Sequence, residues 1–233
     1  MAKVCWLVQR IGILFVLGFA LLSGAWAAPD SVPAWPSEKD LLGAMNKGVK
    51  NQADMGGRIW IRSIHEIAVG KKETGLLVSV WFPDRGRNFS AGTFLYRPNL
   101  KQAREIDYSR SLGLAEVTGR YGEIALLEQY GSGQGTEDFV HSLVRFDGWT
   151  LKELHRAEFA NNLGACGSSS VAVPPSACEQ TWVKLQLLPS QSDALDLLEI
   201  TTRMVGPEPR NTSLSTASRW FRLVGSRFKP VAE

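Results

Sequence analysis

Three histidines are the residues of this sequence whose type is best suited to metal or acid–base chemistry. His65-Glu66 opens an HExxH motif, in which two histidines bind zinc from one face of a helix, but Val69 stands at the second histidine position. His141 and His155 show no ligand spacing with each other or with a cysteine. The sequence therefore predicts no metal site and no cofactor.

A glycine-rich segment offers a second place for chemistry. A serine hydrolase would carry a GxSxG turn, but Tyr130 stands where the first glycine is needed. A phosphate-binding loop would end in Gly-Lys-Ser/Thr before a helix, whereas Thr136-Glu137-Asp138 follows Gly135. We interpret the segment as a mobile connection between two strands, with glycines that supply positive φ. No residue is assigned a catalytic role.

The same segment holds groups that suit recognition. Tyr130 provides a ring, Gln134 an amide, and Glu137 and Asp138 two carboxylates, within a few residues of one connection. Core packing is expected for most tryptophans, but Trp149 follows a predicted turn and is expected to be the most exposed. These five residues form the predicted binding site.

The first 27 residues have the order of a secretory signal peptide. Lys3 and Arg10 form a basic region, an apolar run follows over Ile11–Leu22, and Ala25-Trp26-Ala27 supplies small residues for cleavage. The apolar run is shorter than the about 20 residues of a membrane-spanning helix. Ala25 also stands where a lipoprotein would carry its acylated cysteine. We predict export to the periplasm or the exterior of a bacterium, with no membrane insertion after cleavage.

The net charge and the cysteine content indicate which classes of partner are excluded and whether a disulfide forms. The chain has 233 residues with 26 Lys and Arg, and losing the two basic residues of the signal peptide leaves 24 against 23 Asp and Glu. This balance argues against nucleic acid and anionic membranes as partners. Cys166 and Cys178 remain after cleavage and predict one disulfide in an exported protein, with two buried thiols as the alternative.

The sequence predicts one helix and many short strands as the elements that position the predicted binding residues. Residues 28–36 contain three prolines and predict an extended leader. Ser37 is a suitable N-cap, and the apolar spacing after it predicts an amphipathic helix over about 38–50. From Arg58 onward, apolar and polar residues alternate in short runs, which indicates antiparallel strands with one face on a core.

Three stretches share an order of elements: an apolar strand, a polar turn and an aromatic-rich strand. The paired strands are Leu76–Val78 with Phe94–Tyr96, Ile124–Leu127 with Phe139–Phe146, and Leu195–Leu198 with Trp220–Leu223. This pattern resembles the units of FG-GAP or propeller-type β-repeat proteins, most of all at 126–154. The Asp-rich calcium loop of such families is absent, and unrelated hairpins are the alternative explanation.

The predicted fold is mainly β: an antiparallel meander or sandwich, or incomplete propeller-like sheets, with one N-terminal amphipathic helix. Residues 37–233 are expected to form a single domain whose first edge or end is covered by the helix. We predict an exported non-enzymatic β module that binds a protein or another envelope component. An envelope hydrolase with carboxylates assembled by the fold, and an inhibitor of an exported hydrolase, are the alternatives.

Overall fold

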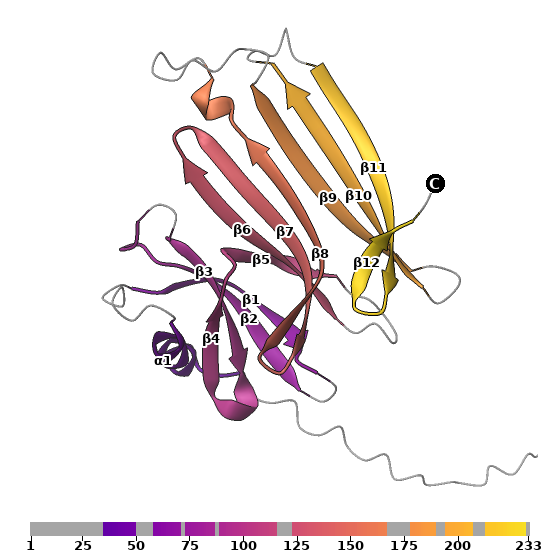
Figure 1. Cartoon of the computed structure of the whole chain (residues 1–233). Helices are drawn as coiled ribbons and strands as arrows, with labels where there is room; N and C mark the ends of the chain where they lie inside the picture. The colour runs from indigo at the N-terminus through magenta and orange to yellow at the C-terminus, as the bar shows by residue number, and fades with distance from the viewer. Residues whose placement is uncertain are drawn as a thin grey trace, which may run out of the picture. The chain divides into compact units, whose positions relative to one another are not determined.

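The computed structural model describes residues 35–49, 58–70, 73–86, 89–115, 123–166, 178–189, 194–206 and 213–231, so the predicted signal peptide and most of the leader lie outside the described residues. One α-helix and twelve strands occupy these ranges (Figure 1), which confirms the mainly-β class. The helix is α1 (Glu38–Gly48). The strands are β1 (Trp60–Ala68), β2 (Thr74–Trp81), β3 (Ala91–Arg97), β4 (Gln102–Ile106), β5 (Arg110–Ala115), β6 (Ile124–Gly133), β7 (Thr136–Asp147), β8 (Thr150–Asn161), β9 (Glu179–Pro189), β10 (Leu195–Val205), β11 (Ser213–Val224) and β12 (Arg227–Pro230).

Helix α1 begins where the sequence predicts. The Ser37 hydroxyl accepts a hydrogen bond from the backbone N–H of Asp40 at 3.2 Å, which caps the first turn. The helix ends at Gly48, two residues before the predicted end, and Val49 is already extended with φ −64° and ψ 133°. A Cβ on Gly48 would lie 2.1 Å from the carbonyl oxygen of Ala103 in β4, so this close approach requires glycine.

The first four strands form an antiparallel sheet in the order β1-β2-β3-β4. Helix α1 packs on a face of this sheet, where Leu41 and Met45 meet Val78 and Phe94. We expected the helix to cover the first edge or an end of the sheet, and it lies on one face, mainly against the edge strand β4. Strand β2 is consequently buried on both faces, whereas its alternation had indicated only one buried face.

The other eight strands form a second antiparallel sheet in the order β12-β11-β10-β9-β8-β7-β6-β5. A core between the two sheets joins Leu77 and Leu95 to Leu127 and Val144. A further core joins residues of β6–β8 to residues of β10–β12, because β8 and β9 pair only at Asn161 and separate beyond it.

The three stretches with a shared order of elements become three antiparallel meanders: β2–β4, β6–β8 and β10–β12. The resemblance to FG-GAP or propeller-type units remains a prediction, because meanders alone do not identify a family. Cys166 and Cys178 form the predicted disulfide. Within the described ranges, no helix is both long enough and apolar enough to cross a membrane.

Candidate functional site

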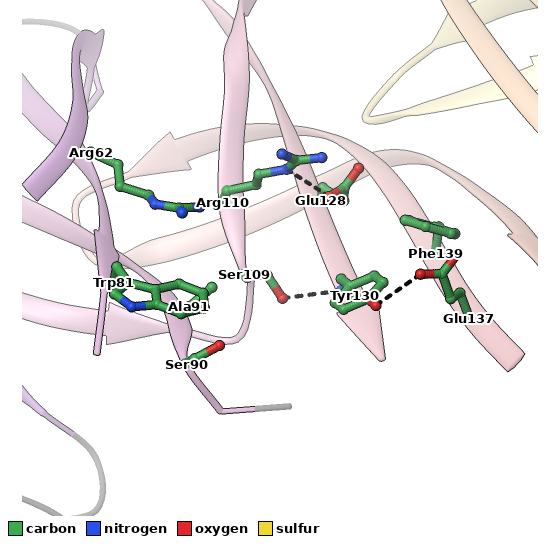
Figure 2. Close-up of a pocket in the computed structure, with 10 residues that line it drawn as sticks. All are labelled: Arg62, Trp81, Ser90, Ala91, Ser109, Arg110, Glu128, Tyr130, Glu137 and Phe139. Carbon is green, nitrogen blue, oxygen red and sulfur yellow. Dashed lines mark hydrogen bonds and ion pairs between the residues drawn. The ribbon is translucent and has the colours of Figure 1, made fainter. Parts of the chain in front are cut away.

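A cavity of about 450 Å³ lies where β5, β6 and β7 meet the end of the four-stranded sheet. We call it the Trp81 pocket, and Figure 2 shows its lining side chains. They are Arg62, Trp81, Ser90, Ala91, Ser109, Arg110, Glu128, Tyr130, Glu137 and Phe139. The pocket thus combines three aromatic rings with two arginines and two carboxylates.

A row of three ionisable side chains crosses the sheet on one side of the pocket. Arg110, Glu128 and His141 lie directly opposite one another on β5, β6 and β7. Arg110 Nε donates to Glu128 Oε1 at 2.7 Å, and His141 Nε2 contacts Glu128 Oε2 at 3.0 Å. Both carboxylate oxygens of Glu128 are therefore occupied by groups of the protein itself.

The row keeps Glu128 ionised. Burial alone raises the pKa of this carboxyl, since only 4% of Glu128 is exposed. The hydrogen bonds from His141 and Arg110 outweigh burial, so the pKa lies below its ordinary value. A carboxylate held in this state accepts hydrogen bonds and is poorly suited to donate a proton to a substrate.

Glu137 and Tyr130 are held by a second set of contacts. The Tyr130 hydroxyl donates to Glu137 Oε1 at 3.1 Å, and Asn161 Nδ2 donates to Glu137 Oε2 at 2.9 Å. The Tyr130 ring lies 5.2 Å from the ring of Phe139, and its backbone N–H donates to the Ser109 hydroxyl at 3.0 Å. These contacts fix the aromatic wall of the pocket.

On the wall of the pocket opposite to Tyr130 and Phe139, the guanidinium of Arg62 lies over the ring of Trp81. The Arg62 guanidinium lies 4.8 Å from the centre of the Trp81 ring, and the Arg62 side chain is exposed. Among the described carboxylates, none forms an ion pair with Arg62. No described residue thus neutralises this charge, which can attract an anionic group that enters the pocket.

Buried hydroxyls continue the polar lining between the two sheets. Ser79 and Thr93 lie opposite each other, two residues inward from Trp81 and Ala91 on the same strand faces. Ser111 of β5 donates its backbone N–H to the Ser79 hydroxyl at 2.8 Å. The hydroxyls of Thr93 and Ser111 are buried and hydrogen-bond to no other described atom.

The predicted mobile connection is a tight hairpin turn. Strand pairing continues to Gly133 and Thr136, so only Gln134 and Gly135 form the turn. Both have positive φ, 49° and 83°, as a two-residue hairpin turn of type I′ requires. The connection is shorter than the sequence predicts, because the two strands extend further than their apolar residues suggest.

Of the five predicted binding residues, Tyr130 and Glu137 line the Trp81 pocket. Gln134 is exposed at the hairpin turn, and Asp138 is exposed on the face of β7 opposite to Glu137. Trp149 is half-buried, with the guanidiniums of Arg97 and Arg104 at 5.0 Å and 4.4 Å from its ring, and it lines a separate cavity of about 410 Å³.

The exposure of the tryptophans differs from the prediction. No tryptophan of the described residues is buried, although core packing was expected for most of them. Trp149, expected to be the most exposed, is covered by its two arginines. The tryptophans with exposed side chains are Trp35, Trp60, Trp182 and Trp220.

The other eight lining residues of the Trp81 pocket were not predicted from the sequence, and these include the charged residues Arg62, Arg110 and Glu128. Glu128 alone left a signal, because it occupies the same strand face as Ile124 and Leu126, where a third apolar residue would be expected. Within the described ranges, no cluster of His, Cys, Asp and Glu could hold a metal ion.

The sequence matches no known protein family, and no curated protein matches it at a significant level.

Proposed function

We propose that this protein is an exported, non-enzymatic β module that binds an envelope component in the Trp81 pocket. One observation supports binding above all: an aromatic pocket with an available arginine contains two carboxylates that are both already hydrogen-bonded within the protein. The Cys166–Cys178 disulfide accords with export, because disulfides form and persist outside the reducing cytosol.

The pocket lining suits a ligand with a ring and an anionic group. The rings of Trp81, Tyr130 and Phe139 offer flat apolar surface against which a sugar ring can stack. Arg62 supplies a cation beside Trp81 for a carboxylate of the ligand. An acidic saccharide of the envelope combines both features, and we propose this class of ligand.

The hydrolase alternative is less well supported. Hydrolysis of a glycosidic bond needs one carboxylic acid that donates a proton and one carboxylate that attacks or activates water. Glu128 has a lowered pKa and contacts Arg110 and His141, while Glu137 contacts Tyr130 and Asn161. Glu128 lacks the raised pKa of a general acid, and the oxygens of both carboxylates already accept hydrogen bonds from groups of the protein.

The test is calorimetric titration of the protein with oligogalacturonate and with a neutral galactose oligomer of the same length. The acidic probe should bind, and the neutral probe should bind more weakly. Arg62→Ala should weaken the acidic probe about tenfold or more, because it removes one charge-assisted contact.

Arg227→Ala is the matched control, since it removes an exposed guanidinium from β12 at the opposite edge of the eight-stranded sheet. It should leave the affinity unchanged. Equal binding of both probes, no binding of the acidic probe, or equal losses in the two variants would contradict the proposed ligand class.

A further inference from the structure

Over most of its length, the outer edge of β11 has no partner among the described strands. On one side β11 pairs with β10 from Ser213 to Arg222. On the other side β12 pairs only with Phe221–Val224, and Val231 N–H donates to Trp220 O at 2.9 Å. No described strand pairs with this side of β11 between Ser213 and Arg219, and Figure 1 shows β12 against only one end of β11.

This edge presents backbone groups that have no hydrogen-bond partner in the described part of the chain. Successive residues of an antiparallel strand direct their N–H and C=O groups to opposite sides. Because the C=O of Trp220 faces outward to Val231, the N–H and C=O groups of Leu214, Thr216 and Ser218 also face outward. All residues from Ser213 to Trp220 are exposed, so these groups are accessible to another strand.

The edge also lacks the features that normally protect edge strands. Ser213–Arg219 contains no proline, no lysine and no acidic residue, and its backbone pairs with β10 without a bulge. Its single charge is Arg219, whose Nε donates to Glu199 Oε1 at 3.1 Å. The open stretch is therefore neutral apart from one arginine that is already paired.

We propose that this edge pairs antiparallel with the same edge of a second copy of the chain, about a two-fold axis at Thr216. Thr216 is the midpoint of the open stretch, which is bounded by Ser213 and by the Trp220 position that Val231 occupies. In this register Thr216 faces Thr216, and Leu214 faces Ser218 of the second copy. In each of these pairs, the backbone N–H and C=O groups of both residues point toward the other copy and can form hydrogen bonds.

The side chains fit this register as well. Arg219 lies opposite Ser213 of the second copy, so no like charges meet across the axis. Both copies use the same edge, so association closes as a dimer and does not extend into a fibre. Residues directly opposite in an antiparallel pair share a face. The exposed side chains of Leu214 and Trp220 from both copies thus lie on one continuous face.

The oligomeric state of the full exported chain tests the proposal, measured by light scattering over a wide range of protein concentration. The wild-type chain should be a dimer. Thr216→Lys and Thr216→Glu should each be monomeric, because each places two like charges opposite each other at the axis. An equimolar mixture of the two variants should form a heterodimer, since the charges at the axis then have opposite sign.

Gln186→Lys is the control, because it adds the same charge at an exposed position of β9, away from the edge. It should remain dimeric, and melting temperatures should show that all variants are folded. A monomeric wild type, a dimeric Thr216→Lys variant, or a mixture that stays monomeric would overturn the proposed edge pairing.

Discussion

Glu128 is buried and ionised at the same time because its neighbours on the sheet compensate the cost of burial. Arg110 and His141 lie opposite it on β5 and β7 and contact one carboxylate oxygen each. An ionised carboxylate buried without such contacts would raise its pKa and take up a proton. The row therefore stabilises the fold only while Glu128 carries its charge.

Replacement of Glu128 by Gln should reduce the free energy of unfolding by about 1–3 kcal/mol at neutral pH, because Arg110 and His141 lose their charged acceptor. The difference in free energy of unfolding between wild type and this variant should become smaller at acidic pH. The pKa of Glu128 is below its ordinary value of 4.5, so its contribution is complete above that pH and is lost as pH falls through the lowered pKa.

Urea unfolding of wild type and Glu128→Gln at neutral and acidic pH measures this difference. A gap in stability that stays constant as the pH falls would show that the charge of Glu128 does not stabilise the fold.

At the scale of elements, the hairpin of β6 and β7 depends on one glycine. Gly135 has φ 83°, and a Cβ added there would lie 2.5 Å from the backbone nitrogen of Ala165. Ala165 belongs to the short 3-10 helix η3 (Leu163–Ala165), which precedes the disulfide. The hairpin turn is therefore packed against η3.

Gly135→Ala should destabilise the protein by about 1–3 kcal/mol, because the substitution combines backbone strain with a clash against backbone atoms. Gly131→Ala is the matched control in the same hairpin, since nothing lies within 4 Å of its added Cβ. Thermal unfolding of both variants measures the effect. Equal losses would contradict the close packing of the turn on η3.

The elements themselves could largely be predicted from local sequence. Ser37 marked the start of α1 through its capping side chain, and the apolar run Leu76–Val78 marked β2. The two buried faces of β2 could not be predicted, because they depend on α1 and on a second sheet formed far along the chain. The Arg110–Glu128–His141 row likewise depends on strand register, which single-strand patterns do not specify.

At the scale of the whole described fold, a second buried carboxylate links strands that are not neighbours. His155 of β8 contacts Glu199 of β10 through Nε2 and Oε2 at 2.7 Å, and Arg219 of β11 also contacts Glu199. Burial raises the pKa of Glu199, but the hydrogen bonds from His155 and Arg219 outweigh it and lower the pKa overall. The His155–Glu199 contact therefore joins β8 to β10 through the core that lies between them, where β8 and β9 are not paired.

The Trp81 pocket also depends on this larger arrangement, because the four-stranded sheet supplies Trp81 and Arg62 and the eight-stranded sheet supplies Tyr130 and Glu137. Tyr130 and Glu137 could be predicted from the sequence because they are close along the chain. Trp81 could not be predicted, because only the packing of the two sheets brings it close to Tyr130 and Glu137.

The affinity of the Trp81→Ala variant for oligogalacturonate, compared with wild type and with Trp182→Ala, tests the central claim most directly. Trp182 is an exposed tryptophan of β9 and serves as the control for loss of an indole ring. Stacking in the Trp81 pocket predicts that Trp81→Ala weakens binding about fivefold or more, whereas Trp182→Ala binds as wild type does. Unchanged affinity in Trp81→Ala would contradict the assignment of this pocket as the binding site.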